Sequence, residues 1–458
     1  MSEIFPFQFK GFRLVLHLVN SSRRNLYVRP LRIFFSPRWV GGIVVALLLA
    51  LFAGCRPSVP DSEGSVRVTE QVDLVDYLKA TPVGQTFEGQ PWITHTNTSD
   101  LDQDGKIDVL FCDAKENSVG WLQQTEQGWI ESALATEIAA PVHVEPSDID
   151  QDGDLDLLIA SMGLVFPNND KIGSVVILEN DGTGQFTKRV IIDQIARVTD
   201  VRAGDFDGDG RIDLAVGQFG YDQGEIRWMR NMGGWRFESH MLLHLSGTIN
   251  VCVADLNGDS HLDIAALVSQ QWEEIYLFEG DGAGNFEKKV IFGSTNEDFG
   301  SSGMALYDLN RDGRLDILYS NGDGFDYARP GPRPWHGVQW LENRGNGFFA
   351  YQRVGDFAGA HCPVGVDLDQ DGDMDVVAVS AFNEWDRPQA ASMMLFENDG
   401  RMNFTPRLLA RTPTHLLTCV AVNLDDGEAP TLLTGGFHAY PPWDRMSRLM
   451  DWRRGQTP

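Results

Sequence analysis

Cysteine is scarce in this chain, with 5 residues in 458, and basic residues are outnumbered by acidic ones, 37 to 65. A small disulfide-rich fold needs many closely spaced cysteines, so that class is excluded. The net charge of −28 argues against nucleic acid as a partner, because binding it requires a basic surface. Beyond Cys55 we interpret the cysteines as small buried core residues, with a Cys362–Cys419 disulfide as the alternative; they are Cys112, Cys252, Cys362 and Cys419.

Long apolar runs are also missing, apart from WVGGIVVALLLALFAGC at 39–55. The 38 residues before it carry seven Lys or Arg and one Glu. A basic segment, an apolar run and small residues are typical of an export signal, and the run is short for a transmembrane helix. Because the small residues lead directly into Cys55, the segment resembles a bacterial lipoprotein signal, which would lipidate Cys55. An uncleaved membrane anchor is the alternative, and either one places the rest of the chain outside the cytoplasm.

Aspartate, in contrast, is abundant and recurs in one nine-residue pattern. DFDGDGRID at 205 has counterparts that begin at 100, 148, 255, 308 and 367, and an eroded copy begins at Asn423. Carboxylates a few ångströms apart repel by about 1 kcal/mol even in water, so each cluster calls for a cation. Calcium accepts six to eight oxygen ligands, which side chains at positions 1, 3, 5 and 9 and the carbonyl of position 7 would supply. Glycine at position 6 permits the required turn with positive φ.

We therefore predict up to six calcium ions. The expected ligand residues, loop by loop, are Asp100, Asp102, Asp104, Lys106 and Asp108; Asp148, Asp150, Asp152, Asp154 and Asp156; Asp205, Asp207, Asp209, Arg211 and Asp213; Asp255, Asn257, Asp259, His261 and Asp263; Asp308, Asn310, Asp312, Arg314 and Asp316; Asp367, Asp369, Asp371, Asp373 and Asp375. The fourth loop has Asn257 at position 3 and Ser260 at position 6, so we expect it to bind calcium most weakly.

The sequence around the loops excludes EF-hands, which need a glutamate at position 12 and a helix on each side. Position 12 is never acidic here, and a short β-prone run such as DLAVGQ follows each loop. A third strand, a glycine-rich turn and a fourth strand then complete each unit. Seven such units, 48 to 59 residues apart, predict an all-β, seven-bladed β-propeller of four-stranded antiparallel blades. The last unit lacks a fourth strand, which we expect from within residues 65–80.

On these loops and strands the chain resembles the FG-GAP or VCBS repeat family, whose relatives include the integrin α-subunit head domains. The resemblance implies a calcium-binding propeller over residues 65–458, preceded by an export segment at 1–54 and a tether at 55–64. It also implies that the ion loops share one face and that partners engage the opposite face.

The opposite face would carry the loops between second and third strands, which vary most in sequence and hold many aromatic residues. Aromatic rings with acids and amides between them suit sugar rings or a protein partner. The alternative is that these side chains pack their own loops. The residues assigned to this ligand face are Tyr221, Trp272, Tyr327, Trp335, Trp385, His438 and Trp443.

Four polar residues stand five positions before the first loop aspartate in blades 1 to 4: His95, His143, Asp200 and Asn250. That register places them near one mouth of the central channel. They would form either a second metal or polar ligand site, or a group satisfied by its neighbours.

These patterns predict a lipid-anchored, extracytoplasmic, monomeric calcium-binding propeller that binds a protein or a glycan. A calcium-dependent polysaccharide lyase or hydrolase on the same scaffold is the alternative, although no nucleophile motif, phosphate loop or cofactor fingerprint is present.

Overall fold

The computed structural model describes residues 7–9, 12–14, 73–75, 77–270, 273–325, 327, 330–424 and 429–455. The chain divides into two units, Met1–Arg67 and Val68–Pro458. In the first unit β1 (Phe7–Phe9) pairs antiparallel with β2 (Phe12–Leu14). Among the described residues, no helix has the length and apolar character to span a membrane. The predicted lipidation residue Cys55 and the tether lie outside the described residues.

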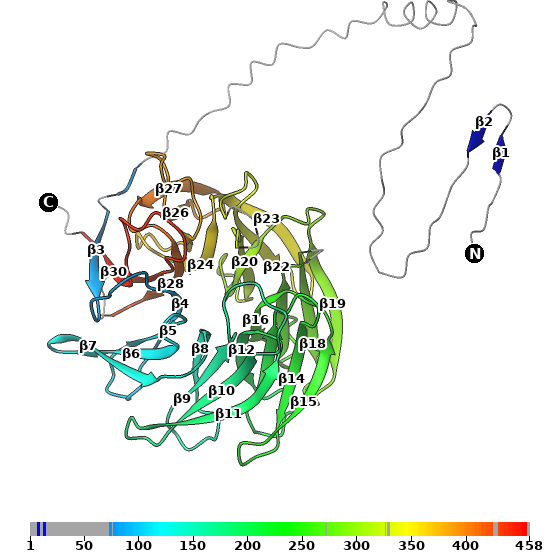
Figure 1. The fold of residues 1–458 in the computed structure, drawn as a ribbon, viewed down its shortest axis with the longest axis horizontal. Helices are drawn as coiled ribbons and strands as arrows, with labels where there is room; N and C mark the ends of the chain where they lie inside the picture. The colour runs from blue at the N-terminus through cyan, green and yellow to red at the C-terminus, as the bar shows by residue number, and fades with distance from the viewer. Residues whose placement is uncertain are drawn as a thin grey trace, which may run out of the picture. The chain divides into compact units, whose positions relative to one another are not determined.

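The second unit contains seven antiparallel sheets of four strands each, which confirms the predicted seven-bladed β-propeller (Figure 1). The strands, blade by blade, are β4 (Ile93–Ser99), β5 (Asp108–Asp113), β6 (Ser118–Thr125) and β7 (Gly128–Ala135); β8 (Pro141–Ser147), β9 (Asp156–Ser161), β10 (Gly173–Asn180) and β11 (Phe186–Ile195); β12 (Val198–Gly204), β13 (Asp213–Gln218), β14 (Glu225–Asn231) and β15 (Phe237–Leu243); β16 (Thr248–Ala254), β17 (Asp263–Val268), β18 (Glu274–Gly280) and β19 (Phe286–Gly293); β20 (Ser301–Tyr307), β21 (Asp316–Asn321), β22 (Gly337–Asn343) and β23 (Phe349–Asp356); β24 (Ala360–Val366), β25 (Asp375–Ser380), β26 (Met393–Asn398) and β27 (Phe404–Ala410); β28 (Leu416–Val422), β29 (Thr431–Gly436), β30 (Leu449–Arg454) and β3 (Leu78–Val83).

Burial explains why the strand after each ion loop reads as a short continuous apolar run. All six residues of β13 are buried, as are those of the corresponding second strand in every blade, because both faces of this strand pack against neighbouring blades. The outermost strands such as β11 instead alternate between exposed and half-buried residues, since one of their faces meets solvent.

A strand from the N-terminal side closes the ring. β3 pairs antiparallel with β30, from Leu78 opposite Arg454 to Val83 opposite Leu449. This confirms the predicted closure, but the strand occupies 78–83 and so overlaps only the last residues of the expected 65–80 stretch. Leu78 and Val83 are buried in the cores on the two sides of the seventh blade, so closing the ring also buries apolar surface.

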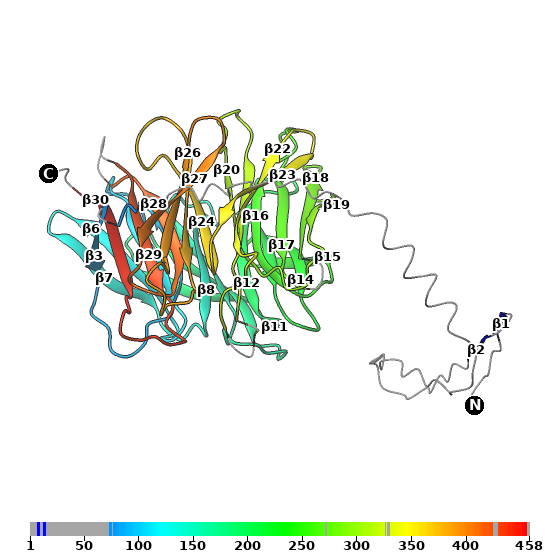
Figure 2. The same cartoon turned by 90° about the horizontal axis from the view of Figure 1, so that it is seen from above.

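The innermost strands surround a central channel. β4, β8, β12, β16, β20, β24 and β28 contact one another in sequence around the ring (Figure 1). In the side view of Figure 2 the strands run between two faces of the propeller unit. Because the strands of a blade alternate in direction, the loops from first to second strand all reach one face and those from second to third strand reach the other. The channel holds a cavity of about 360 Å³.

Candidate metal centres and the opposite face

Each of the six ion loops contains two residues in the left-handed backbone region. At position 6 the glycines have φ between 85° and 103°, and Ser260 has φ 73°. At position 4 the values lie between 57° and 85°, although four of these six residues are Gln or Arg, as at Gln103 and Arg311. The glycine at position 6 predicts the first of these conformations, whereas the conformation at position 4 was not predicted, because only Gly208 and Gly258 signal it.

The carboxylates at positions 1 and 5 hold the loop in its turn. In the first loop Asp100 Oδ2 accepts the Gly105 N–H at 3.0 Å, and Asp104 Oδ1 accepts the Lys106 N–H at 2.9 Å. The same two hydrogen bonds recur in the other five loops. These aspartates therefore stabilise the loop conformation in addition to any ion that they bind.

The aspartate at position 9 is buried and ties the loop to its blade. Asp316 Oδ2 accepts the Leu309 N–H at 3.3 Å, and its Oδ1 accepts the Asn343 N–H of the third strand at 2.7 Å. All six loops share this pair of bonds. Burial raises the pKa of Asp316 to about 6 and that of Asp156 and Asp375 to about 7.

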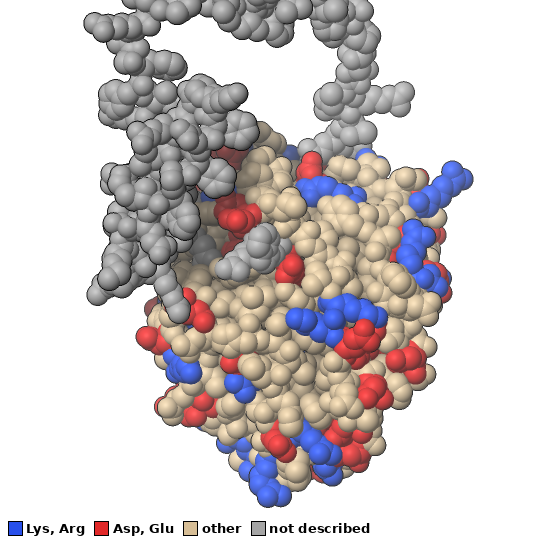
Figure 3. All heavy atoms as spheres, turned by 90° about the vertical axis from the view of Figure 1, so that its right-hand side faces the viewer, with Lys and Arg blue, Asp and Glu red and all other residues tan. Residues whose placement is uncertain are grey.

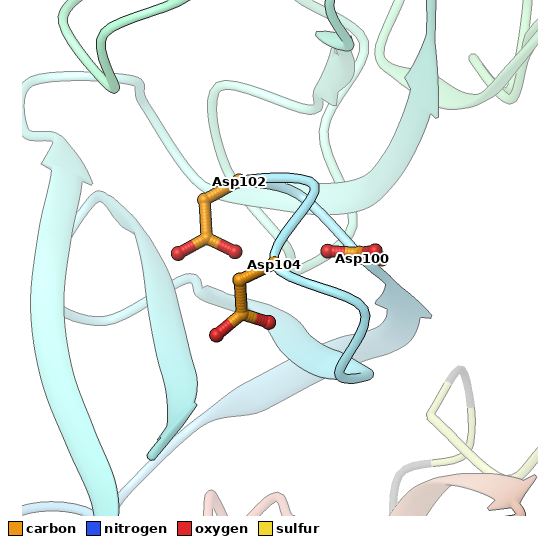
Figure 4. A group of neighbouring side chains, drawn as sticks. All are labelled: Asp100, Asp102 and Asp104. Carbon is orange, nitrogen blue, oxygen red and sulfur yellow. The ribbon is translucent and has the colours of Figure 1, made fainter.

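Four of the loops bring three carboxylates together, with oxygen atoms that all lie within 4.8 Å of one another. The groups are Asp100, Asp102 and Asp104 (Figure 4); Asp148, Asp150 and Asp156; Asp205, Asp207 and Asp213; Asp367, Asp369 and Asp371. In the fully described loops at 255 and 308, where position 3 is Asn257 or Asn310, no such group of three carboxylates forms. A loop with Asp at position 3 thus brings three carboxylates together, and a loop with Asn at this position does not.

The donor atoms in these four acidic clusters fit calcium. Hard carboxylate oxygens in a flexible loop are the ligands that calcium prefers. Asp100 Oδ1 and Asp367 Oδ1 are buried and have no hydrogen-bond partner, although burying an unsatisfied carboxylate oxygen is costly. A bound cation would satisfy both atoms.

The residues predicted for the ligand face divide into exposed and buried ones. Trp443 is 49% exposed, and Tyr221 and Trp335 are half-buried, with Trp335 Nε1 donating to Asp298 O at 2.7 Å. Trp385 and His438 are 7% and 0% exposed, which corrects the expectation that they are available on the surface. Both satisfy polar groups inside the protein.

The contacts of these side chains show what they do. Trp385 Nε1 donates to His415 Nε2 at 3.0 Å, and His438 Nε2 accepts the Ser447 N–H at 3.0 Å. The Tyr327 ring lies under the Arg333 guanidinium, 3.5 Å from ring centroid to Cζ. Trp272 lies outside the described residues.

A different set of aromatic residues meets on this face, which we call the aromatic cluster. It comprises Trp92, Phe166, Phe325, Phe382, Phe437 and Tyr440. Ring centroids are 5.4 Å apart for Trp92 and Phe166 and 4.8 Å apart for Phe325 and Phe382. The rings come from the loops of blades 2, 5, 6 and 7 and from the connection into β4, so they pack across blades rather than on their own loops. Phe325 also lines the channel cavity.

The four polar residues predicted at the channel do lie together and contact one another. His143 Nδ1 is 3.3 Å from Asp200 Oδ1, and the His95 and His143 ring centroids are 4.2 Å apart. Arg202, which the sequence analysis did not single out, contacts Asp200 at 3.1 Å and Glu145 at 2.9 Å. This guanidinium neutralises both carboxylates, which argues against a second metal site. The group is not fully satisfied, however, because His143 Nε2 and Asn250 Oδ1 are buried without a hydrogen-bond partner among the described residues.

Three of the four cysteines agree with the core interpretation, because Cys112, Cys252 and Cys419 are buried, whereas Cys362 is half-buried. Cys112, Cys252, Cys362 and Cys419 are free thiols, so the alternative disulfide is not formed. Cys362 Sγ instead accepts the Cys419 N–H at 3.2 Å.

Comparison with known proteins supports the repeat assignment. The sequence matches the FG-GAP-like repeat family over residues 100–159, 148–216, 205–266 and 266–319. No curated protein matches the chain. Among solved structures it is similar to BBS1N in complex with ARL6DN, soaked with lead, at 11% identity and a TM-score of 0.49, covering 84% of this chain and 99% of that chain. The same complex soaked with mercury has 11% identity and a TM-score of 0.48, covering 84% and 98%. The chain thus carries FG-GAP-like repeats on a seven-bladed β-propeller, with acidic clusters typical of FG-GAP calcium sites.

Proposed function

We propose that this protein is a calcium-stabilised binding module that takes a protein or a glycan on the face opposite the ion loops. The observation that carries the proposal is the aromatic cluster, because rings contributed by several blades converge on this face and one of them, Phe325, also lines the channel cavity. Trp92, Phe166, Phe325 and Tyr440 are each half-buried, so part of every ring remains accessible. Partly exposed aromatic rings are common anchors in binding sites.

Calcium would act as a structural ligand in this proposal. Six ions, one in each loop, would hold the first and second strands of six blades in register and leave the other face free. With all six bound, the formal net charge would change from −28 to about −16. The loops supply the ligands through side chains that already order the turn, so the ions would add stability rather than create the fold.

The charge on the described outer side of the propeller that carries β18 and β19 offers no electrostatic binding site of one sign. Figure 3 shows basic and acidic side chains interspersed on the side that carries β18 and β19. Ion pairs such as Lys289–Glu279 join these strands. Mixed charge of this kind gives the described surface on that side no broad patch of one sign for a polyanion to follow.

We also propose that the module is exported and attached to a membrane, through Cys55 or an N-terminal anchor, and that it acts as a monomer. The basic and apolar pattern of residues 1–55 supports this placement. Metabolic labelling with a palmitate analogue should label the full chain and not a Cys55→Ala variant. Equal labelling of the two would remove the lipoprotein proposal.

Binding is tested by screening the purified propeller, residues 65–458, against a glycan array and acidic polysaccharides, with detection of reaction products. Phe325→Ala and Tyr440→Ala should weaken the binding of any ligand found, whereas Phe348→Ala should leave its binding unchanged. Phe348 is 72% exposed but lies in the turn between β22 and β23, on the ion-loop face. Product formation would favour the lyase or hydrolase alternative, and binding unaffected by both cluster variants would move the site elsewhere.

A further inference from the structure

One residue of the third strand faces each ion loop, and its identity differs between blades. It is the residue immediately before the one whose N–H bonds the position-9 aspartate, as in the Asn231 N–H bond to Asp213 Oδ1 at 2.6 Å. By this definition the equivalent residues, from blade 1 to blade 6, are Gln123, Glu179, Arg230, Glu279, Glu342 and Glu397. Four blades therefore place an acid here, and blade 3 places a base.

The position faces the third residue of the loop. In blade 1 Gln123 Nε2 donates to Asp102 Oδ2, and in blade 3 Arg230 Nε lies 2.5 Å from Asp207 Oδ2. In blades 2 and 6 the nearby charges of Glu179 and Glu397 contribute to raised pKa values of Asp150 and Asp369, for which burial is the largest cause. The third-strand side chain thus sets the charge beside a calcium ligand.

In blade 3 Arg230 forms ion pairs with two of the predicted calcium ligands. Besides its contact with Asp207, its Nη2 lies 3.3 Å from Asp209 Oδ2, and Arg211 also contacts Asp209. The Asp207 side chain is only 5% exposed, whereas the Arg230 side chain is 37% exposed, so the aspartate is shielded from water and the arginine is not. Asp207 is at the same time a member of the carboxylate group with Asp205 and Asp213. An ion entering the loop must share Asp207 with Arg230 or displace the guanidinium.

We propose that Arg230 is a built-in counter-cation that competes with calcium for the third loop, so that this loop fills last. The inference rests on the calcium sites of the proposed function and concerns the order in which they fill. The number of carboxylates alone predicts that the third loop binds calcium more tightly than the fourth, and the inference reverses that order. Beside the fourth loop the corresponding residue is the acid Glu279, which pairs with Lys289 and not with a loop aspartate. Without calcium, the ion pairs of Arg230 with Asp207 and Asp209 stabilise the third loop.

The test is site-by-site calcium occupancy in crystals of the full propeller equilibrated over a calcium series after chelation. In the parent we expect the loop at 205 to need about tenfold more calcium than those at 148 and 367, because a unit positive charge opposes a divalent ion at close range. Arg230→Gln, which copies blade 1, and Arg230→Glu, which copies blade 2, should remove that difference, whereas Arg230→Lys should keep it.

Arg189→Gln is the matched control, because Arg189 pairs with Glu179 of blade 2 and contacts no loop aspartate in the ion pairs described. In the Arg189→Gln variant the third loop should still be the last to fill with calcium. If the loop at 205 fills together with those at 148 and 367 or before the loop at 255 in the parent, or if Arg230→Gln leaves it last, the inference is wrong. If no loop takes up calcium in any variant, the calcium sites themselves are rejected along with it. Melting temperatures of each variant in chelator show whether the fold is retained.

Discussion

Asp156 joins its ion loop to Asn180 on the third strand of the same blade. Its Oδ1 accepts the Asn180 N–H at 2.9 Å, while its Oδ2 accepts the Ile149 N–H at 3.1 Å. Both oxygens are thus engaged by the backbone before any ion arrives, and the side chain is buried. Asp150, two residues into the same loop, has no such link to the third strand. Asp156 therefore has a structural role in addition to its place in the carboxylate group with Asp148 and Asp150.

Asp156→Asn should lower the free energy of unfolding both with calcium and with chelator. The amide nitrogen cannot accept a backbone N–H, and leaving a buried donor unsatisfied costs about 1–3 kcal/mol. Asp150→Asn should destabilise only when calcium is present. Urea unfolding of both variants in each condition makes the comparison. Equal losses confined to the calcium condition would show that Asp156 acts only as a ligand.

Removing calcium should lower the melting temperature of the propeller. An ion that binds only the folded state adds about 2.7 kcal/mol per site at a hundredfold excess over Kd. Differential scanning calorimetry with and without EDTA, together with elemental analysis, measures the effect. A melting curve indifferent to EDTA, from protein that retains no calcium, would reject the assignment of all the loops.

The backbone at position 6 of the fourth loop should limit calcium binding there. Ser260 has φ 73°, and a non-glycine residue in this region costs on the order of 1 kcal/mol. We expect Ser260→Gly to raise the affinity of this loop about fivefold. Gly313→Ser in the fifth loop should lower its affinity by a similar factor, because a Cβ there meets no neighbouring atom and the cost is conformational. Occupancy series for both variants check the pair, and unchanged affinities would show that the turn is not strained.

Acid should weaken the fold partly through His415. Burial, with smaller contributions from His438 and Arg445, lowers the pKa of His415 to about 3. The folded-state pKa of His415 lies below its unfolded value of about 6.5. The stability that the neutral imidazole gives to the folded state is therefore fully present above pH 6.5 and is lost progressively as the pH falls below it. His415→Gln retains an acceptor for Trp385, so between pH 7.5 and 5.0 it should lose up to about 2 kcal/mol less stability than the parent. Identical pH profiles for the two proteins would contradict this.

Deleting β3 should open the ring. Removal of residues 1–83 leaves β30 with an unpaired edge and uncovers apolar surface of two cores. Removal of residues 1–72 keeps the strand, so it is the matched control. We expect a melting temperature near that of the parent for the shorter deletion and a marked fall or aggregation for the longer one. Similar melting of both would mean that β3 does not close the ring.

The repeat by itself determined the architecture and the positions of the ion loops. Aspartates at fixed spacing followed by a six-residue apolar run form a local pattern. Six intact copies and one eroded copy of it allow only a few arrangements that bury the second strand of each blade. The fully buried β13 and the left-handed Gly210 follow from adjacent residues, so both could be predicted. The need for an N-terminal closing strand followed in the same way from an incomplete last blade.

Tertiary structure alone decided which side chains meet across blades and across strands. Arg230 is 25 residues from Asp205 in sequence yet contacts its loop, and Arg202 neutralises Glu145 from the neighbouring blade. No spacing in the sequence predicts either contact. The same holds for Trp385 and His438, whose loops were expected on the surface but whose side chains are buried and both contact His415, which lies in another loop. A short-range pattern specifies backbone conformation and strand order, whereas the partners of a long side chain depend on distances that only the closed ring sets.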